Sequence, residues 1–377
     1  MDEHKSNIGI VTMPISRAGL PPLQQLVKVI SVRANSIFLI TGDAGFDYFK
    51  QCPGVHLYGV VHKLGSHIIT RIFRYIITQF KISLKVWKLC SQVHFFVFST
   101  GGTSLFLPVV TAKLFRKKAI LIITNWEVSY DNKLLSIPLV LLNNLNLLMF
   151  DRIIVYDEIL IQQGNLKNFQ SKINVAPRHF LDFNKFMICK PLVDRKKLIG
   201  YMGRFKPEKG VLNFIRAVPK ILDKVPDLRF IMIGEGPQVQ EVKEYINING
   251  LGDKVLIMEW IDHDLLPKYL NEISLLVLPS YAEQLPNIVL EAMACGTPVL
   301  ATPVGAVPSI IKDGLTGFIM ENNSPECISV NVVRVSNHTD LDLIIKNAHD
   351  LVINKYNFET ISQRYESIFA KLRSDNQ

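Results

Sequence analysis

The chain alternates between short apolar runs of strand length and longer segments in which apolar residues recur at helical spacing. The apolar runs are almost continuous, which is typical of parallel strands that helices cover on both faces. In the first half these runs are Ile8–Met13, Ser36–Ile40, Val55–Val61, Val93–Phe98, Ala119–Thr124 and Arg152–Tyr156. The helical segments between them are Leu23–Ala34, residues 66–90, Ser104–Phe115 and Lys133–Phe150. Alternating strands and helices predict a doubly wound α/β domain.

A second unit of the same kind follows. The pattern weakens from about residue 160 to residue 197, and we interpret this stretch as the end of one domain and a linker. The expected strands after it are Leu198–Gly203, Leu228–Ile233, Lys254–Glu259, Ser274–Leu278 and Pro298–Ala301. The expected helices are Val211–Lys224, Gln238–Asn249, Asp264–Asn271, Asn287–Ala294 and, at the end, Phe358–Leu372. We therefore expect two similar α/β units with a cleft between them, and ligands of such sheets bind beyond the carboxyl ends of the strands.

Composition supports an ordinary globular protein. The chain has 377 residues, 48% of them hydrophobic and 20% charged, which excludes a disordered, collagen-like or coiled-coil protein. Its five cysteines are odd in number and form no CxxC pair, so we expect a reducing compartment and no structural zinc. The polar, acidic N-terminus MDEHKSNIGI lacks the features of a signal peptide, which predicts a cytoplasmic protein.

Charge is distributed unevenly. The first 190 residues carry 22 Lys and Arg against 10 Asp and Glu, whereas the rest of the chain carries 20 against 23. A basic half suggests an anionic partner, either nucleic acid or an anionic membrane surface, although a solvated basic face explains the charge equally well. The aromatic-basic signatures of common nucleic-acid-binding modules are absent from the sequence, so we expect no nucleic-acid partner.

Two apolar segments bear on membrane contact. In Ser66–Leu89 five cations are interleaved with apolar and aromatic residues, the mixture expected of an interfacial helix on an anionic membrane. The alternative is a helix that packs on its own sheet with extended lysines. Leu134–Phe150 is uncharged, but it is too short and too rich in asparagine to span a bilayer, so we expect a helix on or beneath the surface.

The first candidate site for chemistry is the loop GRFKPEKG, residues 203–210, between an expected strand and an expected helix. Arg204 offers a fork of donors and Lys209 a mobile point charge near a helix N-terminus, a combination that suits a diphosphate. Gly203 and Gly210 permit a close turn. The alternative interpretation is an exposed basic loop at an ordinary helix start.

The second candidate site is SYAEQLPNIVLE, residues 280–291, which also connects a strand to a helix. Glu283 lies in the loop and Glu291 more than one turn inside a helix that begins near Pro286. The N–H groups of Asn287 and Ile288 would point out of that helix end, towards an anion. Carboxylates also accept hydrogen bonds from sugar hydroxyls. The alternative is one surface glutamate and one partly exposed helical glutamate, although a carboxylate beside the apolar run AMACG needs a partner.

These segments, together with IMIGEGP and GTPVLATPVGAVPSIIKDGLTGF, resemble the donor-binding domain of the glycosyl transferases group 1 family, the retaining glycosyltransferases of family 4. The resemblance is dense from about Leu198 to Phe318. It implies the GT-B architecture of two Rossmann-like doubly wound domains facing across a cleft. Residues 1–185 would form the acceptor-side domain and residues 186–356 the nucleotide-sugar domain, with a final helix, about residues 357–374, packing back on the first.

The resemblance implies a role for several residues. Arg204 and Lys209 would hold the donor's diphosphate and stabilise it as it leaves, and Asn287 and Ile288 would offer backbone N–H groups to the phosphates. In the first domain, Gly19 would belong to the glycine-containing loop over the phosphates.

The remaining roles concern the sugar and the nucleoside. Glu283 would bind hydroxyls of the transferred sugar, Glu291 the ribose hydroxyls, and Ile261 would lie near the nucleobase. Arg204, Lys209 and Glu283 are thus the expected catalytic residues. No cofactor and no metal are expected, because the cations do the work of a metal ion.

The sequence also departs from the family pattern. The residue after the first motif glutamate is usually glycine and here is Gln284, whose larger side chain could change which hydroxyls are recognised. Many members carry a histidine that faces the sugar, whereas this region reads Thr124-Asn125-Trp126-Glu127. Glu127 could touch the acceptor, although a solvated loop glutamate fits the sequence better.

One motif imitates a metal site. Asp262-His263-Asp264 matches the DxD pattern that binds a divalent cation in another glycosyltransferase fold, but Leu265-Leu266-Pro267 follows it directly. We therefore interpret it as a helix start with an acidic cap. His94, His179 and His349 show no metal-ligand spacing.

The sequence thus favours a metal-independent, retaining hexosyltransferase. It would move a sugar from a nucleotide-diphosphate sugar to a lipid-linked or cell-surface glycan acceptor at the cytoplasmic face of the membrane. Two alternatives remain: a sugar-nucleotide epimerase, for which we find no added acid and base residues, and a nucleotide-sugar-binding protein without activity.

Overall fold

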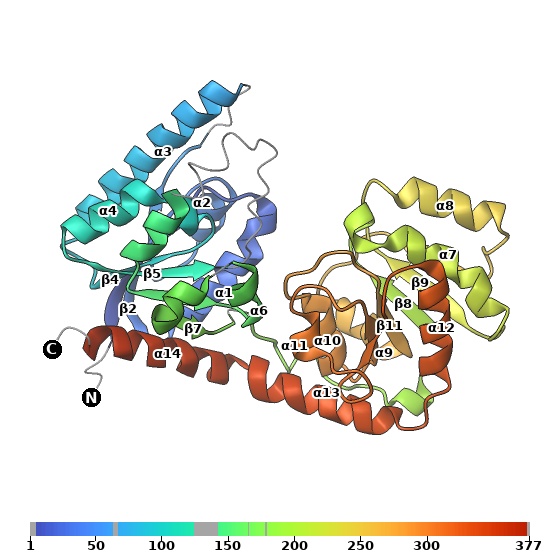
Figure 1. The fold of residues 1–377 in the computed structure, drawn as a ribbon. Coiled ribbons are helices and arrows are strands. Elements are labelled where there is room, and N and C mark those ends of the chain that lie inside the picture. The colour runs from blue at the N-terminus through green and yellow to red at the C-terminus, as the bar shows by residue number, and fades with distance from the viewer. Residues whose placement is uncertain (1–4, 63–66, 124–141, 165, 178, 375–377) are drawn as a thin grey trace. The chain divides into compact units, whose positions relative to one another are not determined.

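The computed structural model describes residues 5–62, 67–123, 142–164, 166–177 and 179–374. The chain divides into two compact units (Figure 1), one made of Met1–Phe180 and Phe358–Gln377 and the other of Leu181–Asn357. Each unit holds one parallel β-sheet with helices on both faces.

The sheet of the first unit has the strand order β3-β2-β1-β4-β5-β6-β7. Its strands are β1 (Ser6–Val11), β2 (Ala34–Thr41), β3 (Val55–Gly59), β4 (Phe95–Phe98), β5 (Lys118–Ile123), β6 (Arg152–Val155) and β7 (Ile173–Val175). The α-helices of this unit are α1 (Leu20–Ser31), α2 (Ala44–Phe49), α3 (Ile68–Leu89), α4 (Phe106–Leu114), an unlabelled helix over 142–149, α6 (Ile159–Gln163) and α14 (Phe358–Ser374).

The sheet of the second unit has the order β10-β9-β8-β11-β12-β13. Its strands are β8 (Leu198–Met202), β9 (Arg229–Ile233), β10 (Val255–Met258), β11 (Leu275–Leu278), β12 (Val299–Ala301) and β13 (Phe318–Ile319). Its helices are α7 (Val211–Leu222), α8 (Val239–Ile248), α9 (Leu266–Glu272), α10 (Asn287–Ala294), α11 (Val307–Ile310), α12 (Pro325–Ser336) and α13 (Leu341–Tyr356).

Both sheets are buried on both faces, which explains the continuous apolar runs. In β4, Phe95 and Val97 point into the core under α1 and α14, whereas Phe96 and Phe98 point into the core under α3 and α4. Figure 1 shows these two helix pairs on opposite sides of the sheet. In the second unit, α7, α8 and α12 cover one face, and α9, α10, α11 and α13 the other. The predicted fold class, two doubly wound α/β domains, is therefore confirmed.

The boundary between the units differs from the sequence-based one at 185/186. Leu181 and Phe186 are both buried in the core of the second unit, and the Leu181 N–H donates to the Tyr356 carbonyl oxygen at 2.9 Å. The second unit therefore begins at Leu181. The chain returns to the first unit at α14, which buries one apolar face beside α1. That face consists of Ile361, Tyr365, Ile368, Phe369 and Leu372.

The expected strands lie within about two residues of the observed ones, but the sequence missed some elements. The strands β7 and β13 are only three and two residues long, too short to produce an apolar run. Helix α13 buries a single narrow stripe of four residues, and α12 places Ser329 and Asn331 on its buried side. Both helices therefore lack the broad apolar face by which amphipathic helices are recognised.

The structure describes the two segments that raised the question of membrane contact to different extents. The first, Ser66–Leu89, contains helix α3. Most of the expected helix Lys133–Phe150 lies outside the described residues, which show only its end, the helix over 142–149. Within the described part of the chain, no helix combines the length and the apolar character needed to cross a bilayer.

The packing of α14 predicts the effect of a substitution at Phe369, which is fully buried with its ring centroid 5.1 Å from that of Phe95. We expect Phe369→Ala to lower the free energy of unfolding by about 3–5 kcal/mol, because it leaves a cavity. The control is Phe80→Ala on α3, where the residue is 58% exposed, and it should change stability by less than about 0.5 kcal/mol. Urea-induced unfolding measures both, and equal effects would show that α14 does not pack on the first unit.

Candidate functional site

The sheet order of the second unit determines where its site can form. Strand β8 lies between β9 and β11, so the chain leaves β8 towards one side and leaves β11 towards the other. At such a point the loops that follow the two strands diverge, and a ligand can bind between them. These loops, residues 203–210 after β8 and residues 279–286 after β11, contain the residues singled out from the sequence.

Backbone contacts lock the two loops together. Gly210 has a φ of +65°, and a Cβ atom there would lie 2.0 Å from the Pro279 carbonyl oxygen, so only glycine fits. The Tyr281 N–H donates to the Glu208 carbonyl oxygen at 2.9 Å. The Tyr281 hydroxyl also accepts from the Asn213 side chain on α7 at 2.9 Å. The loops therefore form one unit.

Lys209 and Glu283 form an ion pair between these loops. The Lys209 ammonium donates to Glu283 Oε1 at 2.7 Å, and the Ser280 hydroxyl donates to the same oxygen at 2.7 Å. The side chains are 19% and 9% exposed, so neither charge is freely hydrated. Oε2 of Glu283 accepts no hydrogen bond from the described residues and is available to a ligand hydroxyl. The sequence placed both residues in one site, and the structure brings them into contact.

Arg204 differs from Lys209, because no side chain of the described residues pairs with it. Its side chain is exposed, and its guanidinium forms no ion pair or hydrogen bond with the described part of the chain. Its backbone is fixed, because the Tyr201 hydroxyl donates to the Arg204 carbonyl oxygen at 3.0 Å. Burial, together with the nearby carboxylates of Glu283 and Glu208, raises the pKa of Tyr201, so this hydroxyl stays protonated and keeps donating.

Glu291 lies on α10 with its side chain only 5% exposed. Its Oε1 is 2.8 Å from Nε2 of His263, whose Nδ1 is 2.9 Å from the Lys185 ammonium. An ammonium can only donate, so Nδ1 accepts and the ring proton lies on Nε2, from which it is donated to Glu291. Lys185 also pairs with Asp264 at 2.6 Å, and this hydrogen bond lowers the pKa of Asp264.

The motif Asp262-His263-Asp264 therefore has a role other than the expected acidic cap, which is wrong. Helix α9 begins later, at Leu266, and its N-terminus has no side-chain cap. Asp262 instead accepts from the Asp264 N–H at 3.0 Å in a local turn. Among the described residues no group of three His, Cys, Asp or Glu side chains could hold a metal ion. The sequence missed His263 and Lys185 as site residues, because 78 positions separate them.

Helix α10 begins where the sequence predicted, directly after Pro286. At this end of the helix, the Val289 N–H donates a hydrogen bond to the Pro286 carbonyl oxygen at 3.0 Å. The N–H groups of Asn287 and Ile288 find no acceptor among the described residues, which leaves them available to an anion.

A third loop supports the position of Glu283. Gly305, after β12, has a φ of +56°, and a Cβ atom there would lie 1.8 Å from the Glu283 carbonyl oxygen. The Ala306 N–H donates to the Gln284 carbonyl oxygen at 2.7 Å. The backbone of Gln284 is thus held, whereas its side chain is exposed.

The other candidate residues belong to other elements of the chain. Ile261 follows β10 and packs, partly buried, against the core beside α9 and α10. Gly19 belongs to the first unit, where it ends a short 3-10 helix just before α1. Asn125 and Glu127 lie outside the described residues.

Comparison with known proteins gives a family for the second unit. Residues 183–358 match the family described as "Glycosyl transferases group 1". The alpha-D-kanosaminyltransferase of Streptomyces kanamyceticus is 29% identical over 182 residues, 48% of this chain and 47% of that protein. The UDP-Gal:alpha-D-GlcNAc-diphosphoundecaprenol alpha-1,3-galactosyltransferase of Escherichia coli is 28% identical over 199 residues, 49% of this chain and 51% of that protein. The chain spans about half the length of the curated relatives it matches.

Solved structures extend the likeness to the whole fold. The crystal structure of Anabaena HepE in complex with UDP superposes with a TM-score of 0.76 and 15% identity, covering 97% of this chain and 99% of HepE. At this identity the likeness shows the fold alone, which is the two-domain GT-B type.

The close contact between Gly305 and the Glu283 backbone predicts that a methyl group added at Gly305 destabilises the fold more than one added at a glycine with open space around it. Gly305→Ala has to move the Glu283 backbone as well as adopt a left-handed conformation, so we expect a loss of about 3 kcal/mol or more in unfolding free energy. Gly314 has a φ of +69° with nothing within 4 Å of an added Cβ, so Gly314→Ala, the control, should cost about 1–2 kcal/mol. Urea unfolding compares them, and equal losses would contradict the contact.

Proposed function

With residues 183–358 identified as a glycosyl transferases group 1 domain, we propose that the chain transfers a sugar from a nucleotide-diphosphate sugar to an acceptor hydroxyl. The observation that carries the proposal is the Lys209–Glu283 ion pair at the divergence of β8 and β11. It places a cation for a diphosphate beside a carboxylate for sugar hydroxyls, on two loops locked to each other.

The cations act on the leaving group. As the bond between the sugar's anomeric carbon and the phosphate oxygen breaks, negative charge grows on the β-phosphate. Arg204, Lys209 and the N–H groups of Asn287 and Ile288 stabilise that charge more in the transition state than in the ground state. These groups supply the charge that a divalent cation would otherwise supply.

The carboxylates select the donor. Oε2 of Glu283 accepts from hydroxyls of the transferred sugar, and the free oxygen of Glu291 accepts from the ribose. Ile261 lies against the nucleobase, and Gly19 lets the loop before α1 approach the phosphates. These roles are taken from the family resemblance, and for Glu283 the observation that Oε2 accepts no hydrogen bond from the described residues supports the role.

The acceptor oxygen forms the new bond to the anomeric carbon on the face from which the diphosphate departs, so configuration is retained. The acceptor's proton passes to the departing phosphate oxygen, which needs no separate protein base. The donor enters as a substrate, and the reaction needs no further cofactor.

For the acceptor we propose a lipid-linked or cell-surface glycan precursor at the cytoplasmic face of the membrane. Two observations support this choice. The E. coli relative is named for action on a diphosphoundecaprenol-linked sugar. Helix α3 of the first unit also carries an exposed apolar surface flanked by cations.

The proposal is tested with a panel of nucleotide sugars, scored for slow hydrolysis of the donor and for transfer. We expect Arg204→Ala and Lys209→Ala each to lower kcat by about 10²–10³, the usual effect of removing one transition-state donor. Glu283→Gln should lower turnover with the preferred sugar most. The control is Arg229→Ala, which removes an exposed cation at the opposite, amino end of β9 and should leave the rate unchanged.

Two results would contradict the proposal. A parent protein that binds no nucleotide sugar excludes the donor site. A parent that binds a nucleotide sugar, loses that binding in Glu283→Ala, yet transfers nothing to any acceptor or water would be a binding protein without catalytic activity.

A further inference from the structure

Helix α3 exposes an unusual amount of apolar side chain for a helix on a water-soluble surface. Ile69 is 76% exposed, Phe73 64% and Phe80 58%. The large apolar residues of this helix that are exposed, among those whose burial is described, are Ile69, Ile72, Phe73, Ile76, Ile77, Phe80, Leu84 and Trp87. Contiguous apolar surfaces of this kind mark sites that contact a protein or a membrane.

These eight residues, which we call the α3 apolar face, lie on one side of the helix. At about 100° per residue they fall within an arc of about 140°. A different side of α3, with Ile82, Val86 and Leu89, is buried against the sheet of the first unit. The Gln79 side chain ties this buried side to α4, because it accepts from the Leu107 N–H at 3.0 Å. The helix is therefore held firmly while its apolar face points away from the core.

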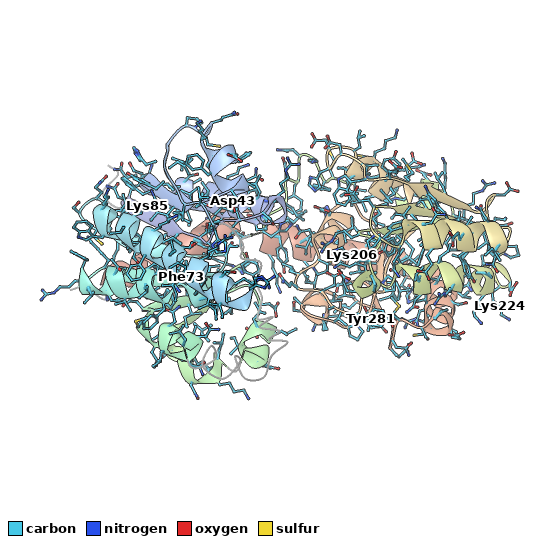
Figure 2. The ribbon with its side chains drawn as sticks, turned by 90° about the horizontal axis from the view of Figure 1, so that it is seen from above. Asp43, Phe73, Lys85, Lys206, Lys224 and Tyr281 are labelled. Carbon is cyan, nitrogen blue, oxygen red and sulfur yellow. The ribbon has the colours of Figure 1, made fainter. Side chains whose placement is uncertain are left out.

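Cations border the α3 apolar face, and α3 contains no acidic residue at all. Five cations, Arg71, Arg74, Lys81, Lys85 and Lys88, occupy an adjoining arc of about 100°. None of the three lysines has a carboxylate partner among the described residues. Phe73 and Lys85 are both labelled in Figure 2, where they mark the apolar side and the cationic border of this helix.

The charge determines which occupant fits. If α3 of a second copy covered the apolar face, two rows of cations would meet without a carboxylate on either helix, and like charges repel. A nucleic acid would satisfy the cations but would leave the aliphatic and aromatic side chains in water. An anionic bilayer satisfies both at once, with apolar side chains among the acyl chains and lysines at the headgroups.

We propose that α3 is the membrane-docking element of this protein and lies in the interface of an anionic bilayer. The apolar face enters the boundary between headgroups and acyl chains, and the adjoining lysines Lys81, Lys85 and Lys88 contact the anionic headgroups. This docking does not depend on the transfer reaction, so its failure would leave the proposed sugar transfer standing and would remove only one of the two supports for a membrane-associated acceptor.

The test is co-sedimentation of the full chain with vesicles of phosphatidylcholine alone or mixed with phosphatidylglycerol. We expect binding to the anionic vesicles only, and weaker binding as salt rises. Lys85→Gln with Lys88→Gln should weaken binding by about fivefold for each lysine removed. Phe73→Ser with Phe80→Ser should weaken it by more than about tenfold.

The controls are Leu343→Ser, an apolar residue that is 60% exposed on α13, and Lys224→Gln, an exposed lysine of the second unit. Both should bind like the parent, and the circular dichroism of every variant should match the parent, because none of the changed side chains belongs to a buried core. The proposal is wrong if the α3 variants bind as the parent does, or if neutral and anionic vesicles bind equally. It is equally wrong if Phe73→Ser with Phe80→Ser instead abolishes a dimer seen by light scattering.

A second, independent observation concerns His263. Glu291 is a nearly buried carboxylate whose only hydrogen bond from a side chain among the described residues comes from His263. The Lys185 ammonium fixes which ring nitrogen carries the proton, and the ring lies against Phe186 with centroids 5.3 Å apart. The imidazole is thus held in one tautomer and one orientation, aimed at Oε1 of Glu291.

We infer that His263 is a positioning residue for Glu291, and that it leaves Oε2 directed at the ribose hydroxyls of the donor. This inference rests on the proposed function, since it assigns a partner to the ribose-binding carboxylate. Without the imidazole the carboxylate could rotate or attract water, and its discrimination between hydroxyl and hydrogen on the ribose would fall.

The measurement is the ratio of affinities for a nucleoside diphosphate and its 2′,3′-dideoxy counterpart, using whichever of UDP, GDP and ADP the parent binds. We expect His263→Leu to reduce this ratio by about tenfold. His263→Gln should restore much of it, because the amide can still donate. The control His349→Leu, on α13, should leave it unchanged.

The possible failures can be told apart. If the parent binds none of the three nucleotides, the proposed function fails. If the parent binds one and prefers its ribose form, but His263→Leu keeps the same ratio, the proposed function stands and the positioning role of His263 is refuted.

Discussion

The ion pair between Lys209 and Glu283 is the interaction on which the second unit's site depends. Removing two charges from water is costly, and an ion pair of this kind persists only where geometry and further hydrogen bonds compensate. Here Ser280 supplies the further hydrogen bond, and Gly210 lets the two loops approach closely enough for the pair to form. The backbone of the loops is thus built around this pair, and its failure would leave a poorly hydrated carboxylate without a counter-charge.

The two units share one topology but divide the chemistry between them. Each sheet has a point where consecutive strands diverge, and in the second unit ionisable side chains come together there. The first unit carries the chain's excess of positive charge, much of it on the outside of α3. Under the proposed function the second unit recognises the donor, while the first presents a surface suited to the anionic environment of the acceptor.

The sequence predicted the fold because parallel strands buried on both faces produce continuous apolar runs, as in β4 and β11. It singled out Arg204, Lys209 and Glu283 because they lie in the loops that follow two such runs, and the structure pairs Lys209 with Glu283. It could not find Lys185 or His263, whose role arises only when a segment before β8 folds against the start of α9. For the same reason it misread Asp262 and Asp264 as a cap, since only the structure shows Lys185 beside Asp264.

Under the proposed function, the carboxylate of Glu283 also couples sugar recognition to stabilisation of the leaving group. Lys209 and Ser280 both donate to Oε1 of Glu283, so the carboxylate plane is fixed before any ligand arrives. Under the proposed function, a sugar hydroxyl that donates to Oε2 draws electron density away from Oε1 and loosens its hold on the ammonium. The Lys209 ammonium, held less tightly by Oε1, then interacts more strongly with the diphosphate. Under the proposed function, recognition of the sugar and stabilisation of the leaving group are linked through one carboxylate, whereas Arg204, which has no such partner among the described residues, acts on the phosphates of any donor alike.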